Sequence, residues 1–182
     1  MMGIETTMIR RPTRTRFIAF VAVMSGLSNA LGFLAMPMGP VTLHLIQLPI
    51  VFAGLATGPV AGGLVGFFGA FIMAFTLAKP NPYIIGGNAL LGFLVGALYL
   101  RMRRLSKRPV IPQIVSVFIA YLLQLPYLYV TDVYLMGMPH PVVLGIMGVL
   151  LVEDLISALI SHVILYRVDV NALLAHEDRS CR

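Results

Sequence analysis

Long apolar stretches that carry almost no charge fill most of this sequence. Residues 84–98, for example, contain no charged side chain at all. Only 11% of the 182 residues are charged and 59% are hydrophobic, whereas soluble domains are about 45–50% apolar and about 25% charged. A chain with so little charge cannot cover a water-facing surface, so the sequence predicts an integral membrane protein. The long runs lack the alternation typical of membrane barrels, which favours helices.

Breaks in the apolar pattern predict an all-α bundle of six transmembrane helices. A helix needs about 20 mostly apolar residues to cross about 30 Å of hydrocarbon. The predicted spans cover residues 17–36, 43–56, 60–77, 83–100, 111–131 and 142–167. The second span is short and contains Pro49, which predicts that it is tilted, kinked or only partly embedded. The chain is therefore divided into a basic segment at 1–16, a membrane domain at 17–167 and a tail at 168–182.

The positive charges predict the orientation of these spans, because Lys and Arg are retained on the cytoplasmic side. Six spans place the N-terminus, the loop after the fourth span and the C-terminal tail on one side. These three regions hold twelve of the thirteen basic residues, and Lys79 is the remaining one. We therefore expect a multi-pass protein of the plasma membrane with both termini in the cytoplasm. The net charge of +6 is explained by this asymmetry and by anionic lipid headgroups, so no nucleic-acid partner is expected.

The sequence offers little for catalysis, metal binding or cofactors. Its single cysteine, Cys181, lies next to the C-terminus, and the histidines form no recognisable metal signature. Neither a nucleophile turn nor a cluster of acidic metal ligands is present, so we expect no enzyme, no catalytic residue, no metal and no cofactor. A Walker-type glycine loop is also missing, so any ATP hydrolysis has to come from another chain.

Small residues recur every fourth position in three predicted spans, a pattern that lets membrane helices approach closely. The ridges consist of Gly58, Gly62, Gly66, Ala70 and Ala74 in the third span, Gly92 and Gly96 in the fourth, and Ala22, Gly26 and Ala30 in the first. For the third and fourth spans we predict internal packing. The ridge in the first span suits either internal packing or docking of a partner helix.

Two adjacent acids, Glu153 and Asp154, lie near the middle of the last span. An ionisable residue at the bilayer centre costs at least about 2.5–3.5 kcal/mol, so it is a functional candidate by default. Neighbouring helical residues point about 100° apart, so the two acids cannot share one task. We expect one of them to face a cavity and the other to tie the helix to a neighbour. The alternative is that both are interhelical anchors.

Further polar residues of the predicted spans gather toward the outer half. Gln124 and Tyr127 lie on one stripe of the fifth span, with Tyr121 and Thr131. Aromatic rings with an amide suit a planar ligand that forms hydrogen bonds, although an interfacial aromatic belt explains the tyrosines equally well. Other outer polar residues are His44, Asn88 and Asp132. Together they predict a ligand cavity that opens outward.

The sequence resembles the substrate-binding S components of energy-coupling factor (ECF) transporters over about residues 14–166. The most specific part runs from His44 to Gly66 and is similar to the family's second and third helices, joined by a tight turn at Gly58 and Pro59. In this family the first helix carries an Ala-xxx-Ala motif that docks on the coupling subunit. Ala22, Gly26 and Ala30 match it, with glycine in the central position.

The resemblance implies that this chain binds a small water-soluble micronutrient, while a transmembrane coupling subunit and two ATPase subunits drive uptake. It implies a pocket formed by the loop at 36–42 and by Asn88, Gln124, Tyr127, Asp132 and Glu153, to which the residue pattern adds His44. It leaves open which vitamin or micronutrient is bound. A self-sufficient secondary carrier or a structural membrane protein is the alternative.

Overall fold

The structure is a computed structural model that describes residues 14–34, 36–38, 41–76, 80–105 and 109–168. Most of the predicted basic segment at 1–16 and of the tail at 168–182 lies outside the described residues, as does Lys79. The elements are α1 (Arg14–Gly32), β1 (Met36–Met38), β2 (Val41–Leu43), α2 (Gln47–Thr57), α3 (Pro59–Gly69), α4 (Phe71–Thr76), α5 (Tyr83–Met102), α6 (Val110–Tyr129), the π-helical turn η1 (Val130–Leu135) and α7 (His140–Arg167).

Within the described residues, four helices are long and apolar enough to cross a membrane, namely α1, α5, α6 with η1, and α7. The predicted second and third spans correspond to shorter apolar helices, 47–57 and 59–75. The short α2 agrees with the expectation that this segment is not a full straight span. The structure thus supports a multi-pass membrane protein, and the count of six spans stays a prediction.

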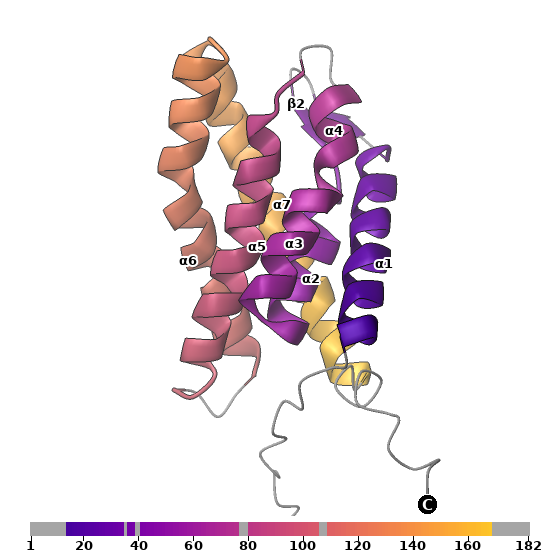
Figure 1. Ribbon diagram of the computed structural model, residues 1–182. Helices are drawn as coiled ribbons and strands as arrows, with labels where there is room; N and C mark the ends of the chain where they lie inside the picture. Colours follow the sequence, from indigo (N-terminus) through magenta and orange to yellow (C-terminus); the bar gives the residue numbers. More distant parts are fainter. Residues whose placement is uncertain (1–13, 35, 39–40, 77–79, 106–108, 169–182) are drawn as a thin grey trace, which may run out of the picture.

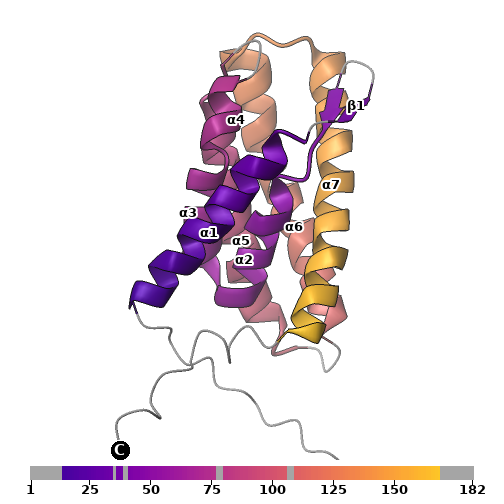
Figure 2. The same cartoon turned by 90° about the vertical axis from the view of Figure 1, so that its right-hand side faces the viewer.

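The helices form an elongated bundle with α1 on one side and α6 on the other (Figure 1), and α7 packs against α2 and α6. The start of α1, the end of α5 and the end of α7 lie at the same end of this bundle. That end therefore carries Arg14, Arg101 and Arg167, each in a terminal helical turn. The hairpin, α4 and the connection from η1 to α7 lie at the opposite end, which we call the hairpin end (Figure 2). Which end faces the cytoplasm stays a prediction.

A short hairpin replaces the predicted end of the first span and the predicted start of the second. β1 and β2 pair antiparallel, with Pro37 opposite Thr42. Proline lacks the N–H that a helix needs and fixes its own φ angle, so the chain leaves helical geometry before residue 37. Accordingly α1 ends at Gly32 and α2 begins only at Gln47. The bundle is therefore helical apart from this small hairpin.

The predicted third span is interrupted at Ala70, between α3 and α4. An interruption frees backbone groups that the lipid cannot satisfy. The side chain of Asn29 on α1 supplies both missing partners, because its Nδ2 donates to the Phe68 carbonyl (2.8 Å) and its Oδ1 accepts from the Ile72 N–H (2.9 Å). Asn29 thus bridges the break and fixes α1 beside it.

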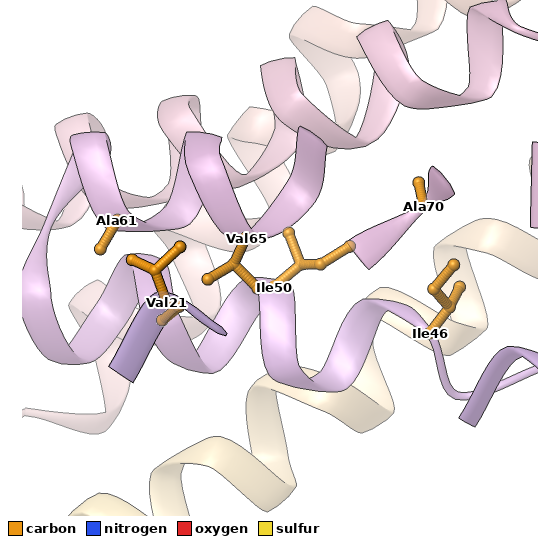
Figure 3. Close-up of a cluster of buried hydrophobic side chains, with 7 residues drawn as sticks. Val21, Ile46, Ile50, Ala61, Val65 and Ala70 are labelled. Carbon is orange, nitrogen blue, oxygen red and sulfur yellow. The ribbon is translucent and has the colours of Figure 1, made fainter. Parts of the chain in front are cut away.

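Small side chains let α1, α2 and α3 pack tightly in a buried cluster (Figure 3). Its members are Val21, Ile46, Ile50, Ala53, Ala61, Val65 and Ala70. A second cluster joins α2, α5, α6 and α7 through Val51, Leu55, Leu91, Val95, Val117, Ala120 and Ala158. Together the two clusters make α2 the centre of the bundle.

Glycines allow the backbones of α3 and α5 to touch. A Cβ atom added to Gly62 would lie 2.2 Å from the Gly92 carbonyl oxygen, and one added to Gly66 would lie 2.2 Å from the Asn88 carbonyl oxygen. Real Cβ contacts are essentially never this short, so only glycine fits at this crossing. The prediction of internal packing for these two ridges is confirmed.

Candidate functional site

Two buried acids occupy the centre of the longest helix. Glu153 and Asp154 are the fourteenth and fifteenth residues of the 28-residue α7, so each lies about 20 Å from either helix end at 1.5 Å per residue. Their side chains are 0% and 1% exposed. Charged groups at such a depth need partners.

Glu153 binds the backbone of the segment that leads from the hairpin into α2. The His44 N–H donates to Glu153 Oε1 (2.6 Å), and the His44 ring nitrogen Nδ1 lies 3.4 Å from Oε2. His44 precedes the first turn of α2, so its N–H has no helical partner. Because a buried backbone donor must be satisfied within the protein, Glu153 acts here as a brace for the hairpin.

The same segment is held from the other side by α1. The Ser28 hydroxyl donates to the Ile46 carbonyl oxygen over 2.7 Å, and both residues are buried. The residues 44–46, which we call the entry segment, are thus fixed between α1 and α7.

Asp154 differs from its neighbour. Both of its carboxylate oxygens are buried, and no hydrogen-bond partner for them is found in the part of the chain that the structure describes. The phenol of Tyr121 on α6 lies within electrostatic range of this carboxylate. However, the Tyr121 hydroxyl donates to the Met147 carbonyl (2.6 Å). Asp154 therefore faces the interior between α6 and α7 without a donor from these residues.

Two residues of the predicted polar stripe on α6, Gln124 and Tyr127, face α5, whereas Tyr121 contacts α7. Gln124 Nε2 donates to the Gly87 carbonyl (2.8 Å), and the Tyr127 hydroxyl donates to the Tyr83 carbonyl (3.0 Å). Asn88 on α5 donates to the Ile84 carbonyl of its own helix (3.0 Å). Its buried Oδ1 has no partner among the residues described. Gln124 and Tyr127 thus hold α5 and α6 together, and Asn88 carries a buried acceptor without a described partner.

Asp132 joins the hairpin end of α6 to the loop before α5. Asn81 Nδ2 donates to Asp132 Oδ1 (3.1 Å), and the Asp132 carbonyl accepts from the Met138 N–H (2.9 Å). Both residues are buried, at 7% for Asp132 and 2% for Asn81. This hydrogen bond joins η1 to the loop before α5 at the hairpin end.

The six predicted ligand residues therefore lie in three separate places in the structure. His44 meets Glu153, Asn88 lies by the α5–α6 contact that Gln124 and Tyr127 form, and Asp132 pairs with Asn81. The sequence pairs Gln47 with His44, three residues before it, as polar residues that open the second predicted span, and the buried Gln47 Oε1 has no partner within the described ranges. Sequence reasoning missed Ser28 and Asn29 as structural residues. A signal existed for both, since they are polar residues off the small-residue ridge of α1.

The ridge of α1 points away from the bundle. Ala22, Gly26 and Ala30 are all exposed, and a Cβ added to Gly26 would meet nothing within 4 Å. The buried face of α1 consists instead of Val21, Ser25 and Ser28. Over the described residues, no group of three or more His, Cys, Asp or Glu side chains could hold a metal ion.

Comparisons with known proteins agree on one kind of protein. The family model for "ECF transporter, substrate-specific component" matches residues 16–168. One solved structure, described as the S component of a bacterial ECF transporter, is similar with a TM-score of 0.67 and 20% identity, covering 88% of this chain and 99% of its own. Another, described as the S component for biotin from an ECF-type ABC transporter, has a TM-score of 0.61 and 21% identity, covering 86% and 92%. The search of curated proteins found no match.

Proposed function

Because this chain belongs to the family of substrate-specific components of ECF transporters, we propose that it binds a small water-soluble micronutrient at the hairpin end of the bundle. This family is a class of transporter subunits and not of enzymes. In the proposed mechanism the chain binds the ligand, and a separate transmembrane coupling subunit with two ATPase subunits drives uptake. The chain would lie in the plasma membrane with both termini in the cytoplasm.

The observation that carries this proposal is a set of buried polar atoms without partners in the described chain. They include Gln47 Oε1, Asn88 Oδ1, both carboxylate oxygens of Asp154, and Glu153 Oε2, which has the His44 ring 3.4 Å away. The others are His44 Nδ1 and the hydroxyls of Ser25, Ser157 and Ser161. An unsatisfied polar group in an apolar medium costs on the order of 1–3 kcal/mol. A bound molecule rich in hydrogen-bond donors would remove this cost. A water-soluble micronutrient has such donors, whereas a lipid tail does not.

The six predicted residues have two kinds of role in this proposal. Asn88 offers a free acceptor to the ligand, while Gln124 and Tyr127 hold α5 and α6 at the distance that leaves this acceptor free. Glu153 braces the entry segment, which brings the His44 ring into the site. Asp132, paired with Asn81, closes the bundle near the entrance.

The ligand is proposed only by class. One structural relative is described as an S component for biotin, which supports a ligand of vitamin size. At 21% identity this likeness shows a common fold. The polar groups of this chain therefore have to be interpreted directly to identify the ligand.

The exposed ridge at Ala22, Gly26 and Ala30 is proposed as the docking face for the coupling subunit. Small residues on a lipid-facing surface bring no packing benefit within the chain. On a surface that meets another helix they allow close backbone approach. The exposure of all three residues supports this role, since a ridge used for internal packing would be buried.

The proposal is tested by purifying the chain in detergent and identifying the small molecules that it releases by mass spectrometry. A thermal-shift panel of water-soluble vitamins would accompany this measurement. We expect one tightly held metabolite and no uptake by the chain alone in liposomes. Uptake by the isolated chain would instead favour a self-sufficient carrier. A chain that binds no metabolite and no vitamin would favour a structural role.

A further inference from the structure

The two adjacent acids of α7 are in different chemical situations. Glu153 accepts a hydrogen bond from the His44 N–H and has the His44 ring 3.4 Å from its second oxygen. Asp154 is equally deep, at 1% exposure, yet neither of its oxygens has a partner within the described part of the chain. Glu153 thus has a hydrogen-bond donor from the backbone, whereas Asp154 has no donor among the described residues.

The described arginines all stand in the terminal turns of helices or directly after them, and they are Arg14, Arg16, Arg101, Arg103, Arg104 and Arg167. His162, about two helical turns after Asp154 on α7, has its ring nitrogen Nδ1 2.7 Å from Gln113 Oε1. Arg167, on the same helix, is thirteen residues away, or about 20 Å along the axis. The imidazole of His44 lies beside Glu153, and the Tyr121 hydroxyl donates to a backbone carbonyl.

We propose that Asp154 is the carboxylate that binds the ligand and that it pairs with a positively charged nitrogen of that ligand, while Glu153 only positions the entry segment. The substrate class is then a nitrogenous cation, such as a primary ammonium, an amidinium or a cationic ring with an amino group. This inference rests on the proposed function and narrows it. It assigns to Asp154 a contact that Glu153, already engaged by the backbone, does not make.

The same geometry disfavours anionic ligands. Asp154 is buried, so a ligand carboxylate placed beside it would meet a like charge in a medium of low dielectric constant. Such repulsion discriminates between ligands as strongly as a favourable contact does. We therefore expect the site to select for charge, with a cation bound and a carboxylate rejected.

The test uses the full chain in lipid nanodiscs and four probes of vitamin size. Thiamine and pyridoxamine carry a positively charged nitrogen, whereas biotin and pantothenate carry a carboxylate and no cation. Binding is measured by calorimetry for the unaltered chain, for Asp154→Asn and for the control Ser116→Ala. Ser116 is a buried residue of α6 whose hydroxyl already donates to the Pro112 carbonyl. The molecule that the purified chain releases is identified in parallel.

We expect that the released molecule carries a positively charged nitrogen, that a cationic probe binds and that neither carboxylate probe does. Asp154→Asn should weaken cation binding at least about a hundredfold, since one partner of a buried charge pair is lost. Ser116→Ala should leave it unchanged.

Three outcomes would overturn the inference. Retention of an anionic or neutral molecule, or equal cation affinity in Asp154→Asn, would refute it and leave the proposed binding function standing. A chain that retains no metabolite and binds no probe would overturn both. If Asp154→Asn does not fold, the charge selectivity of the unaltered chain decides the question without any variant.

Discussion

The crossing of α3 and α5 makes a quantitative prediction for Gly62→Ala. The added Cβ would lie 2.2 Å from the Gly92 carbonyl oxygen and 2.9 Å from the Gly54 Cα. Ordinary contact begins at 3.4 Å, so the helices must separate by about 1.2 Å, the difference between 3.4 and 2.2 Å. Both neighbouring atoms belong to the backbone. No side-chain rotation can therefore relieve the clash.

The cost of this separation follows from the contacts that it weakens. The full attraction between two atoms in contact is about 0.1–0.2 kcal/mol per pair, and a radial gap of 0.5–1 Å removes a quarter to a half of it. If about 30 pairs along the crossing lose half of their attraction, the loss is about 2 kcal/mol. This agrees with the range of about 1–3 kcal/mol measured for overpacked cores.

Thermal unfolding in detergent measures this effect. A chain of this size loses about 2–4 °C in Tm per kcal/mol, so Gly62→Ala should lower Tm by about 4–8 °C. The matched control is Gly148→Ala, because a Cβ at Gly148 of α7 meets nothing within 4 Å. There the higher helix propensity of alanine should leave Tm unchanged or raise it. Equal Tm values for the two variants would refute the tight crossing.

Three further predictions concern the brace, the docking face and the topology. Glu153→Gln keeps an acceptor for the buried backbone donor, so its Tm should fall less than that of Glu153→Ala; equal losses would contradict the brace. Ala22→Leu combined with Gly26→Leu should abolish co-purification with the coupling subunit while sparing ligand binding, and a retained complex would rule out this docking face. Leu105→Cys in a Cys181→Ser background should react with an impermeant maleimide only in opened cells; labelling of intact cells would reverse the topology.

The sequence predicted the helices best where the apolar runs are long and uninterrupted. The predicted spans 83–100 and 142–167 correspond to α5 and α7 within two residues at each end. The hairpin and the break at Ala70 were not predicted. The residues around them are as apolar as the helices, and hydropathy does not distinguish a helix from a hairpin. The break depends on Asn29, whose partners lie 39 and 43 residues away in sequence.

The candidate site was predicted in part for a similar reason. Buried acids are rare enough in membrane spans to single out Glu153 and Asp154 from the sequence alone. The partner of Glu153 is a backbone N–H, and any residue type except proline would offer one at position 44. The stripe of Gln124 and Tyr127 faces α5, where their polar ends reach carbonyls of Gly87 and Tyr83. The type of a residue does not reveal which side chain will bind its main-chain carbonyl, so these contacts could not be predicted from the sequence.

The entry segment is hydrogen-bonded to both α1 and α7, so it couples the positions of these two helices. Ser28 on α1 holds the Ile46 carbonyl, and Glu153 on α7 holds the His44 N–H two residues earlier. Hydrogen bonds lose most of their strength when stretched by about an ångström. A partner that displaces α1 by this distance must therefore either break the first bond or pull the segment, and with it the hairpin, away from α7. Force applied on the lipid-facing side of α1 is thus transmitted to the buried acids.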